Sequence, residues 1–201
     1  MMYDYLKKLK DEKGFMPKRI LDIGAWNGFW TKRVKTIWPT AHFTCIEAGP
    51  KHKEKLMKLT KDSHIAVLGD SNKKVKMYLR EIDKGYKKKI TYTKGSTLFG
   101  IFKDYEMRQM QTLNEIVGND AEYDLIKQDV QGAEIMIMDG APDIFRKAKY
   151  VIQEVNIYKD ENLPDMPAEE EMDKYMYNLG FKQNQIIEKK VNATQLDKIY
   201  F

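Results

Sequence analysis

The sequence predicts an α/β domain built on a mostly parallel β-sheet, and two observations support this. Apolar segments of strand length alternate with amphipathic helical segments over residues 19–68, a pattern typical of parallel sheets with right-handed crossovers. Glycines and acidic residues follow these segments, and open α/β sheets bind ligands beyond the carboxyl ends of their strands. At 201 residues and 42% hydrophobic content, we expect a single domain over residues 1–201.

The alternation begins after an N-terminal helix that we expect within residues 1–18. Residues 20–24 read as an apolar strand, and the apolar side chains that follow fall at helical spacing until Pro39 ends the helix. Residues 41–47 read as a second strand, and Pro50 begins a second helix with an apolar inner face. Residues 64–68 read as the third strand.

The pattern is interrupted over residues 71–123, which we expect to be an irregular insertion between the third and fourth core strands. Within it, the segments with regular character are two possible strands and a short helix, at 74–79, 87–93 and 111–117. Beyond it, the expected core strands are 124–130, 150–155 and a closing antiparallel pair, 181–188 and 197–201. A helix should run through 132–138, and another should end at Gly180.

Composition limits the possible classes of protein. No apolar run approaches the roughly 18 residues of a membrane span, and the N-terminal residues lack a signal-peptide core. Cys45 is the single cysteine, which excludes a disulfide and a cysteine-based zinc site. The three histidines lack the spacing of metal ligands. We therefore expect a cytoplasmic protein with no metal and no membrane partner.

The basic residues are unevenly distributed. Residues 51–94 contain fourteen basic and five acidic side chains, and such a block attracts phosphates or nucleic acid. However, only five of the 35 basic residues in the chain are arginine, the residue that planar, bidentate recognition of phosphates and bases favours. A solvated lysine-rich surface is the favoured interpretation, with nucleic acid as a possible but less favoured partner.

The loop after the first strand has the form Asp22-x-Gly24-x-x-x-Gly28. It lacks both the G-x-G-x-x-G of dinucleotide sites and the Gly-Lys-Ser/Thr of a P-loop, so no phosphate-bearing cofactor is indicated. Glu47 ends the second strand, where a carboxylate can accept hydrogen bonds from ribose hydroxyls, and Asp22 suits a cationic ligand. A nucleoside with an amino group and no phosphates, S-adenosylmethionine, fits this set. The expected cofactor-binding residues are Asp22, Gly24, Ala25, Trp26, Asn27, Gly28, Glu47, Ala48, Gly69, Asp70, Ser71 and Asp129.

Seven segments occur in the order seen in one enzyme family. They are "ILDIGAWNGFW", "CIEAGP", "VLGDSNKKVKMY", "GSTLF", "TLNEIV", "DLIKQDVQGAE" and "VIQEVN". In these the chain resembles the FkbM-type S-adenosylmethionine-dependent methyltransferases. The resemblance implies a Rossmann-like class I methyltransferase fold: a mostly parallel seven-stranded sheet with an antiparallel C-terminal strand and helices on both faces. It also implies O-methylation, often of sugar or polyketide hydroxyls.

The resemblance assigns roles to several positions. It gives the glycine loop and Glu47 to the cofactor, places Asp70 near the adenine, and gives Asp129 and Glu134 to the "DVQGAE" element. Gln128 departs from the family, which usually has an aliphatic residue there, and therefore requires a buried polar contact. The lysine-rich region before "GSTLF" is also unusual, which bears on the class of methyl acceptor.

Methyl transfer to a hydroxyl needs alignment of the acceptor and benefits from a general base, worth roughly 10²–10⁴-fold. Asp129 and Glu154 end adjacent strands, and we expect them to be the catalytic carboxylates. The alternatives are a helix N-cap for Asp129 and a rim group or substrate acceptor for Glu154. The residues expected to contact the substrate are Ser96, Thr97, Glu134 and Asn156. A pair of carboxylates can hold a divalent cation, but no third ligand is evident.

The sequence therefore favours a methyltransferase that modifies a hydroxyl of a sugar, glycan or other small molecule. One alternative is a methyltransferase that acts on RNA or protein through the basic residues 51–94. Others are a nicotinamide-dependent oxidoreductase, which the missing G-x-G-x-x-G disfavours, and a non-catalytic nucleoside-binding domain. The oligomeric state does not follow from the sequence.

Overall fold

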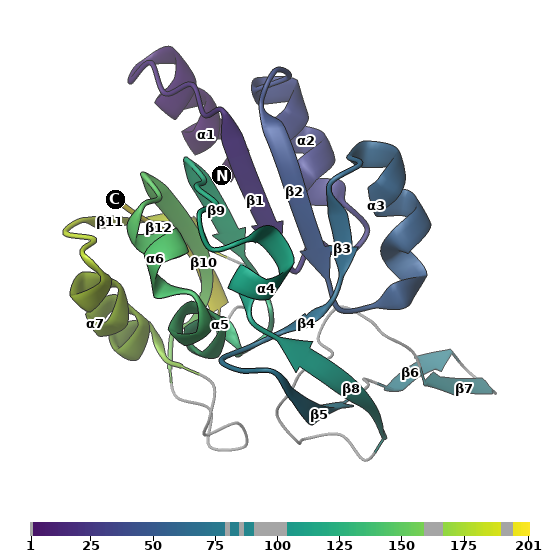
Figure 1. Cartoon of the computed structure of the whole chain (residues 1–201). Helices are drawn as coiled ribbons and strands as arrows, with labels where there is room; N and C mark the ends of the chain where they lie inside the picture. Colours follow the sequence, from purple (N-terminus) through teal and green to yellow (C-terminus); the bar gives the residue numbers. More distant parts are fainter. Residues whose placement is uncertain (1, 79–80, 85–86, 91–103, 159–166, 190–194) are drawn as a thin grey trace.

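The computed structural model describes residues 2–78, 81–84, 87–90, 104–158, 167–189 and 195–201. A seven-stranded central sheet has the order β11-β12-β10-β9-β1-β2-β3 (Figure 1). Its strands are β1 (Arg19–Ile23), β2 (His42–Glu47), β3 (Ser63–Ile65), β9 (Leu125–Gln128), β10 (Tyr150–Asn156), β11 (Asn184–Lys189) and β12 (Gln195–Tyr200). All neighbouring pairs from β3 to β10 are parallel, whereas β12 is antiparallel to both β10 and β11. The mostly parallel sheet with an antiparallel C-terminal strand is therefore confirmed.

Helices cover both faces of this sheet, as expected (Figure 1). On one face lie α1 (Met2–Asp11), α2 (Phe29–Ile37) and α3 (Lys53–Leu59), with a short 3-10 helix, η1 (Pro50–His52), before α3. On the other lie α4 (Leu113–Val117), α5 (Glu134–Gly140), α6 (Pro142–Arg146) and α7 (Glu169–Leu179). Side chains alternate between the two faces of a strand, so Ile20 packs with the α1 and α2 side chains while Leu21 packs with those of α5 to α7.

Two smaller sheets lie near the carboxyl ends of the central strands (Figure 1). One has the order β4-β8-β5, formed by β4 (Val67–Leu68), β8 (Tyr105–Gln111) and β5 (Lys73–Tyr78). The other pairs β6 (Glu81–Lys84) with β7 (Lys87–Ile90). All of these elements except β4 fall within the expected insertion, where the sequence predicted neither β6 nor β8. The single-domain organisation stays a prediction.

The third strand differs from the sequence expectation. We expected one strand over 64–68, but the chain forms β3, which pairs with β2, and then β4, which pairs with β8. Ala66 separates them, and its backbone N–H donates to the carbonyl of Glu47, the last residue of β2. Because β2 ends there, the chain has no further partner in the central sheet, and Val67 instead packs with Met77 and Met110.

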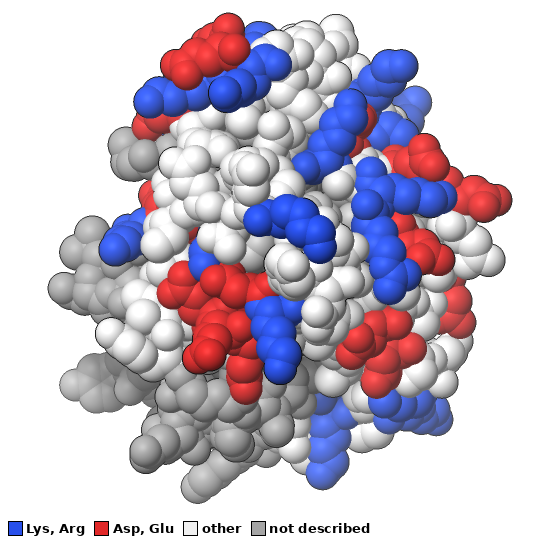
Figure 2. Space-filling model, turned by 90° about the vertical axis from the view of Figure 1, so that its left-hand side faces the viewer, with Lys and Arg blue, Asp and Glu red and all other residues white. Residues whose placement is uncertain are grey.

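The last helix and its surroundings agree with the sequence. Gly180 takes a left-handed φ of 117° at the C-terminus of α7, whose first turn is acidic. Figure 2 views the side of the molecule that α7 covers, and acidic side chains gather near its centre. Among the helices that the structure describes, none is long and apolar enough to cross a membrane.

Candidate functional site

The expected site residues converge at the carboxyl ends of β1, β2, β9 and β10. The chain order along the sheet reverses between β1 and β9, and such a switch point is where open α/β sheets bind ligands. The loops that follow β1, β2 and β9 meet there.

The glycines of the first loop are required by close packing inside the protein. Gly24 has a φ of +77°, and a Cβ there would lie 1.9 Å from the backbone oxygen of Asp129. Gly28 also has a φ of +77°, and its Cβ would lie 2.1 Å from a methyl carbon of Leu59. We had expected these glycines to admit a ligand. The groups that approach them in the structure are the end of β9 and the side of α3.

Glu47 holds the glycine loop and its own loop together. One carboxylate oxygen accepts a hydrogen bond from the backbone N–H of Trp26 at 2.7 Å, and the other accepts one from that of Gly49 at 2.7 Å. Burial raises the pKa of Glu47, while these two backbone donors act to lower it. Each oxygen retains a second lone pair, so the side chain can still accept hydrogen bonds from a diol.

The remaining loop residues divide into exposed and internally bonded groups. Trp26 has a φ of 49° and is 41% exposed. The side-chain oxygen of Asn27 accepts a hydrogen bond from the N–H of Phe29 at 3.1 Å, which forms an Asx turn just before α2. Ala25 is buried, and the half-buried Ala48 packs against the cluster of the second sheet.

Asp22 lies beneath the loop and is fully buried. Its position on β1 turns the carboxylate towards α2, where the Thr31 hydroxyl donates to one oxygen at 2.5 Å. The Lys127 ammonium lies 3.8 Å from the other oxygen. Burial raises the pKa of Asp22, and Lys127 opposes that shift. The direct ligand contact expected of Asp22 is therefore not what the structure shows, because the charge is buried and has an internal counter-ion.

The two expected catalytic carboxylates are brought together by a third residue. The side-chain amide nitrogen of Gln131 lies 2.9 Å from Asp129 Oδ1 and 2.5 Å from Glu154 Oε2. Glu154 is 5% exposed, and Lys127 Nζ lies 3.3 Å from Asp129 Oδ2. The alternative role of Asp129 as a helix N-cap is wrong, because α5 begins at Glu134 with no side-chain cap.

Glu134 has a supporting position rather than the substrate contact that we expected. Its carboxylate is buried at the start of α5 and accepts a hydrogen bond from the N–H of Val130 at 3.1 Å. Burial raises its pKa from 4.5 to about 7, while the backbone of Glu134 itself, of Val130 and of Gly132 acts to lower it. The side chain thus stabilises the loop that carries Gln131.

The buried polar contact expected of Gln128 is confirmed. Gln128 is fully buried and donates to the backbone oxygen of Glu134 at 3.1 Å. Its own side-chain oxygen accepts a hydrogen bond from Gln153 at 2.9 Å. These bonds connect β9, β10 and α5 on the face opposite Lys127.

Other expected residues lie further out. Asp70 is exposed near the second sheet, where Ser71 and Lys73 donate to its carboxylate at 2.6 and 3.0 Å and lower its pKa. Gly69 packs against Met110. Asn156 ends β10 and accepts a hydrogen bond from Gln195 at 3.2 Å. Ser96 and Thr97 lie outside the described residues.

Sequence reasoning gave no role to three residues at the site. Lys127 is a charged residue inside an apolar strand and precedes Asp129 by two residues, a spacing that places both on the same face, so this pattern was a usable signal. Gln131 has no comparable signal. His52 is 7% exposed, its ring lies 6.0 Å from that of Trp26, and burial lowers its pKa to about 4.

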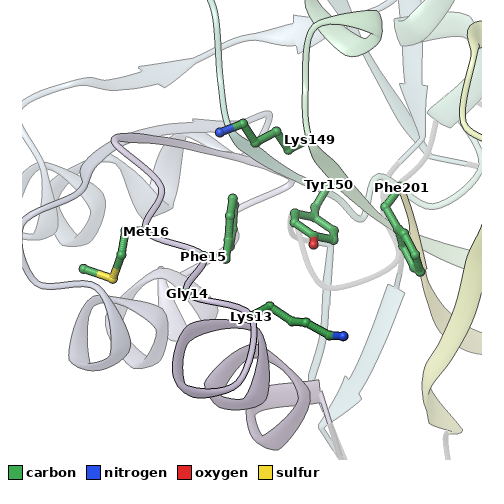
Figure 3. A pocket seen from close by; sticks show the side chains of 7 residues that line it. All are labelled: Lys13, Gly14, Phe15, Met16, Lys149, Tyr150 and Phe201. Atoms are coloured by element: carbon green, nitrogen blue, oxygen red, sulfur yellow. The ribbon is translucent and has the colours of Figure 1, made fainter.

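Two further features bear on the extent of the site. Across the described ranges, no group of three His, Cys, Asp or Glu residues is placed to hold a metal ion. A hollow of about 500 Å³ is lined by Lys13, Gly14, Phe15, Met16, Lys149, Tyr150 and Phe201 (Figure 3). Because Tyr150 begins β10 and residues 13–16 precede β1, this hollow lies at the opposite end of the sheet and is separate from the site.

Comparison with solved structures supports the fold. The chain is 11% identical to methyltransferase FkbM from Methylobacillus flagellatus KT, with a TM-score of 0.59. The match covers 100% of this chain and 48% of the Methylobacillus protein. It is 10% identical to an O-methyltransferase from Bacillus cereus in complex with SAH, with a TM-score of 0.55. This match covers 98% of the present chain and 78% of the Bacillus protein. The chain thus spans about half the length of the first of these proteins. No curated protein matches it.

The family is established by a model of the FkbM methyltransferase domain, which matches residues 22–183. This range includes the glycine loop, Glu47, Asp129, Gln131 and Glu154. It also contains the whole parallel part of the sheet from Asp22 onwards. The chain therefore belongs to the FkbM methyltransferase family and has the Rossmann-like fold of S-adenosylmethionine-dependent methyltransferases.

Proposed function

We propose that this protein uses S-adenosylmethionine to methylate a hydroxyl group of a sugar, glycan or other small molecule. The observation that carries the proposal is the pair of carboxylates of Asp129, which follows β9, and Glu154, near the carboxyl end of β10, joined by the Gln131 amide beside the glycine loop. A hydroxyl acceptor needs a proton acceptor at this place, and two are present.

The residues present fit the cofactor. Glu47 has acceptor capacity left for the ribose hydroxyls after its two backbone bonds. Around the end of β9, the acidic side chains Asp22, Asp129 and Asp197 act on the ammonium of Lys127, and Glu154 shares the Gln131 amide with Asp129. This excess of negative charge favours a ligand that carries a positive charge.

When bound, the cofactor supplies an activated methyl group that departs from a sulfonium and leaves a neutral thioether. The protein's own residues would orient the acceptor and take its proton. The acceptor hydroxyl would pass its proton to Asp129 or Glu154 as its oxygen bonds to the methyl carbon. The FkbM relative and the O-methyltransferase of Bacillus cereus support this class of reaction by analogy of fold.

A second candidate is methylation of RNA or protein through the basic residues 51–94. Lys73, Lys74 and Lys76 are exposed on β5, and Lys76 Nζ lies 4.5 Å from the ring centre of Tyr105, which is 46% exposed. Lysine with an exposed aromatic ring suits single-stranded nucleic acid. We favour the small-molecule acceptor because this surface lacks clustered arginine. A cytoplasmic location remains a prediction.

A methyl-transfer screen with labelled S-adenosylmethionine against sugars, lipids and RNA tests the proposal. Asp129→Asn and Glu154→Gln serve as matched variants, because both keep the side-chain volume and remove the charge. We expect transfer to a hydroxyl of a small molecule, reduced in both variants, with cofactor affinity nearly unchanged in Glu154→Gln. Methylation of RNA alone would favour the second candidate, and full activity in both variants would exclude a carboxylate base.

A further inference from the structure

We infer that Gln131 is a positioning residue that holds the Asp129 and Glu154 carboxylates in the arrangement that accepts the substrate's proton. The inference rests on the proposed function, and it names the residue that joins a side chain following β9 to a side chain of β10. It is carried by the geometry of the loop between β9 and α5.

The backbone at Gln131 is held in an unfavourable conformation. Its φ is +60°, and among the described residues only Trp26 is a second non-glycine residue with a positive φ. A left-handed backbone costs free energy for a residue with a Cβ, so it persists where the surroundings enforce it. Here the Glu134 carboxylate accepts a hydrogen bond from the backbone N–H of Val130, the residue before Gln131, and so fixes the start of this turn.

This conformation places the amide between the two carboxylates. The NH2 group has two hydrogens and no acceptor, so it can donate one hydrogen bond to each of two oxygens. Those oxygens are Asp129 Oδ1 at 2.9 Å and Glu154 Oε2 at 2.5 Å. Because Gln128 pairs with Gln153 in the β9–β10 register, the next residues, Asp129 after β9 and Glu154 within β10, lie side by side, where their charges repel. A shared neutral donor reduces that repulsion and fixes both side-chain orientations.

The arrangement predicts how substitutions act. Gln131→Met keeps the length and removes the donor, so the two carboxylates should separate and turnover should fall roughly 10- to 100-fold, as expected for misplaced catalytic groups. Cofactor affinity should stay within about threefold, because the amide bonds to carboxylates and not to the glycine loop. Gln131→Glu adds a third carboxylate and should be worse at neutral pH. On protonation it regains one O–H donor, so its activity relative to wild type should recover as the pH falls.

The pH test must allow for the other charged groups at this end of the sheet. They are Glu47 of β2, Asp22 of β1, Lys127 of β9, Asp197 of β12 and Glu134 of α5. All are common to the wild type and the variants, so the ratio of activities isolates position 131. Gln153→Met is the matched control, since Gln153 donates to Gln128 on the opposite face of the sheet. It should lose stability without changing the pH profile.

A readout independent of turnover distinguishes this inference from the proposed function. The side-chain amide of Gln131, identified in a ¹⁵N spectrum by its absence in Gln131→Met, should carry two hydrogen-bonded protons. Both should shift in Asp129→Asn and in Glu154→Gln. If the amide is bridged but no acceptor is methylated, the proposed reaction fails while the bridge stands. If the amide protons ignore both variants, or if Gln131→Met turns over normally, the positioning role is overturned.

Discussion

Glu134 should make the stability of this protein depend on pH between about 4.5 and 7. Burial raises the pKa of its carboxyl group from 4.5 to about 7 in the folded chain. Between these values the folded state holds a proton that the unfolded state releases, so stability falls as the pH rises and the loss is complete above the folded pKa. At 1.36 kcal/mol per pKa unit, the shift corresponds to about 3 kcal/mol.

Urea denaturation of the wild type and Glu134→Gln at pH 5, 6, 7 and 8 measures how the ionisation of Glu134 changes the free energy of unfolding. Glutamine keeps an oxygen that can accept the hydrogen bond from Val130 but cannot ionise. The stability of the variant relative to wild type should therefore increase by about 3 kcal/mol from the bottom to the top of the range. Glu170→Gln, an exposed carboxylate of α7, is the control and should show no such trend. A pH-independent difference between wild type and Glu134→Gln would refute the reasoning.

Three further predictions follow. Glu47→Ala should weaken S-adenosylmethionine binding at least roughly tenfold, since charged hydrogen bonds contribute about 1.5–3 kcal/mol each; unchanged affinity by calorimetry in a folded variant would remove Glu47 from the site. Gly24→Ala should destabilise by roughly 3 kcal/mol through overpacking and a left-handed backbone. Gly118→Ala, with a φ of +89° and open space around its Cβ, should cost only about 1 kcal/mol, and equal losses in urea denaturation would contradict the packing argument. Nonspecific RNA binding through residues 51–94 should fade at roughly 150 mM salt in a titration, and binding that persists there would favour the nucleic-acid function.

The sequence predicts the core strands well, because strands buried on both faces appear in the sequence as short apolar segments. The ends of every strand of the central sheet lie within three residues of the expected ends, apart from the third strand, whose second half leaves the sheet. That exception depends on β2 ending at Glu47, which no local pattern in residues 64–68 reveals. β8 was missed because it pairs with β4 and β5 away from the main core, and most of its side chains are exposed.

The site shows the same division between local and non-local information. Asp129 and Glu154 could be predicted as neighbours because each lies at or near the carboxyl end of an expected strand and the two strands follow one another in the chain; β10 in fact continues to Asn156. The bridge by Gln131 could not, since nothing in the letters "DVQGAE" specifies a left-handed glutamine. The counter-ion of Asp22 required the knowledge that β9 lies directly beside β1, with Asp22 opposite Lys127. Sheet order is a property of the whole chain.

Asp129 is the residue at which these separate contacts meet. Its backbone oxygen touches the position that a Cβ on Gly24 would occupy, and its side chain bonds to Lys127 and Gln131. The loop expected to hold the cofactor therefore packs on the same residue whose carboxylate lies beside Glu154. A methyl transfer requires the donor and the proton acceptor to keep a fixed separation, and contact through one backbone carbonyl provides it without a dedicated linking element. Under the proposed function, the glycine at position 24 therefore matters because it allows the end of β9 to approach the loop.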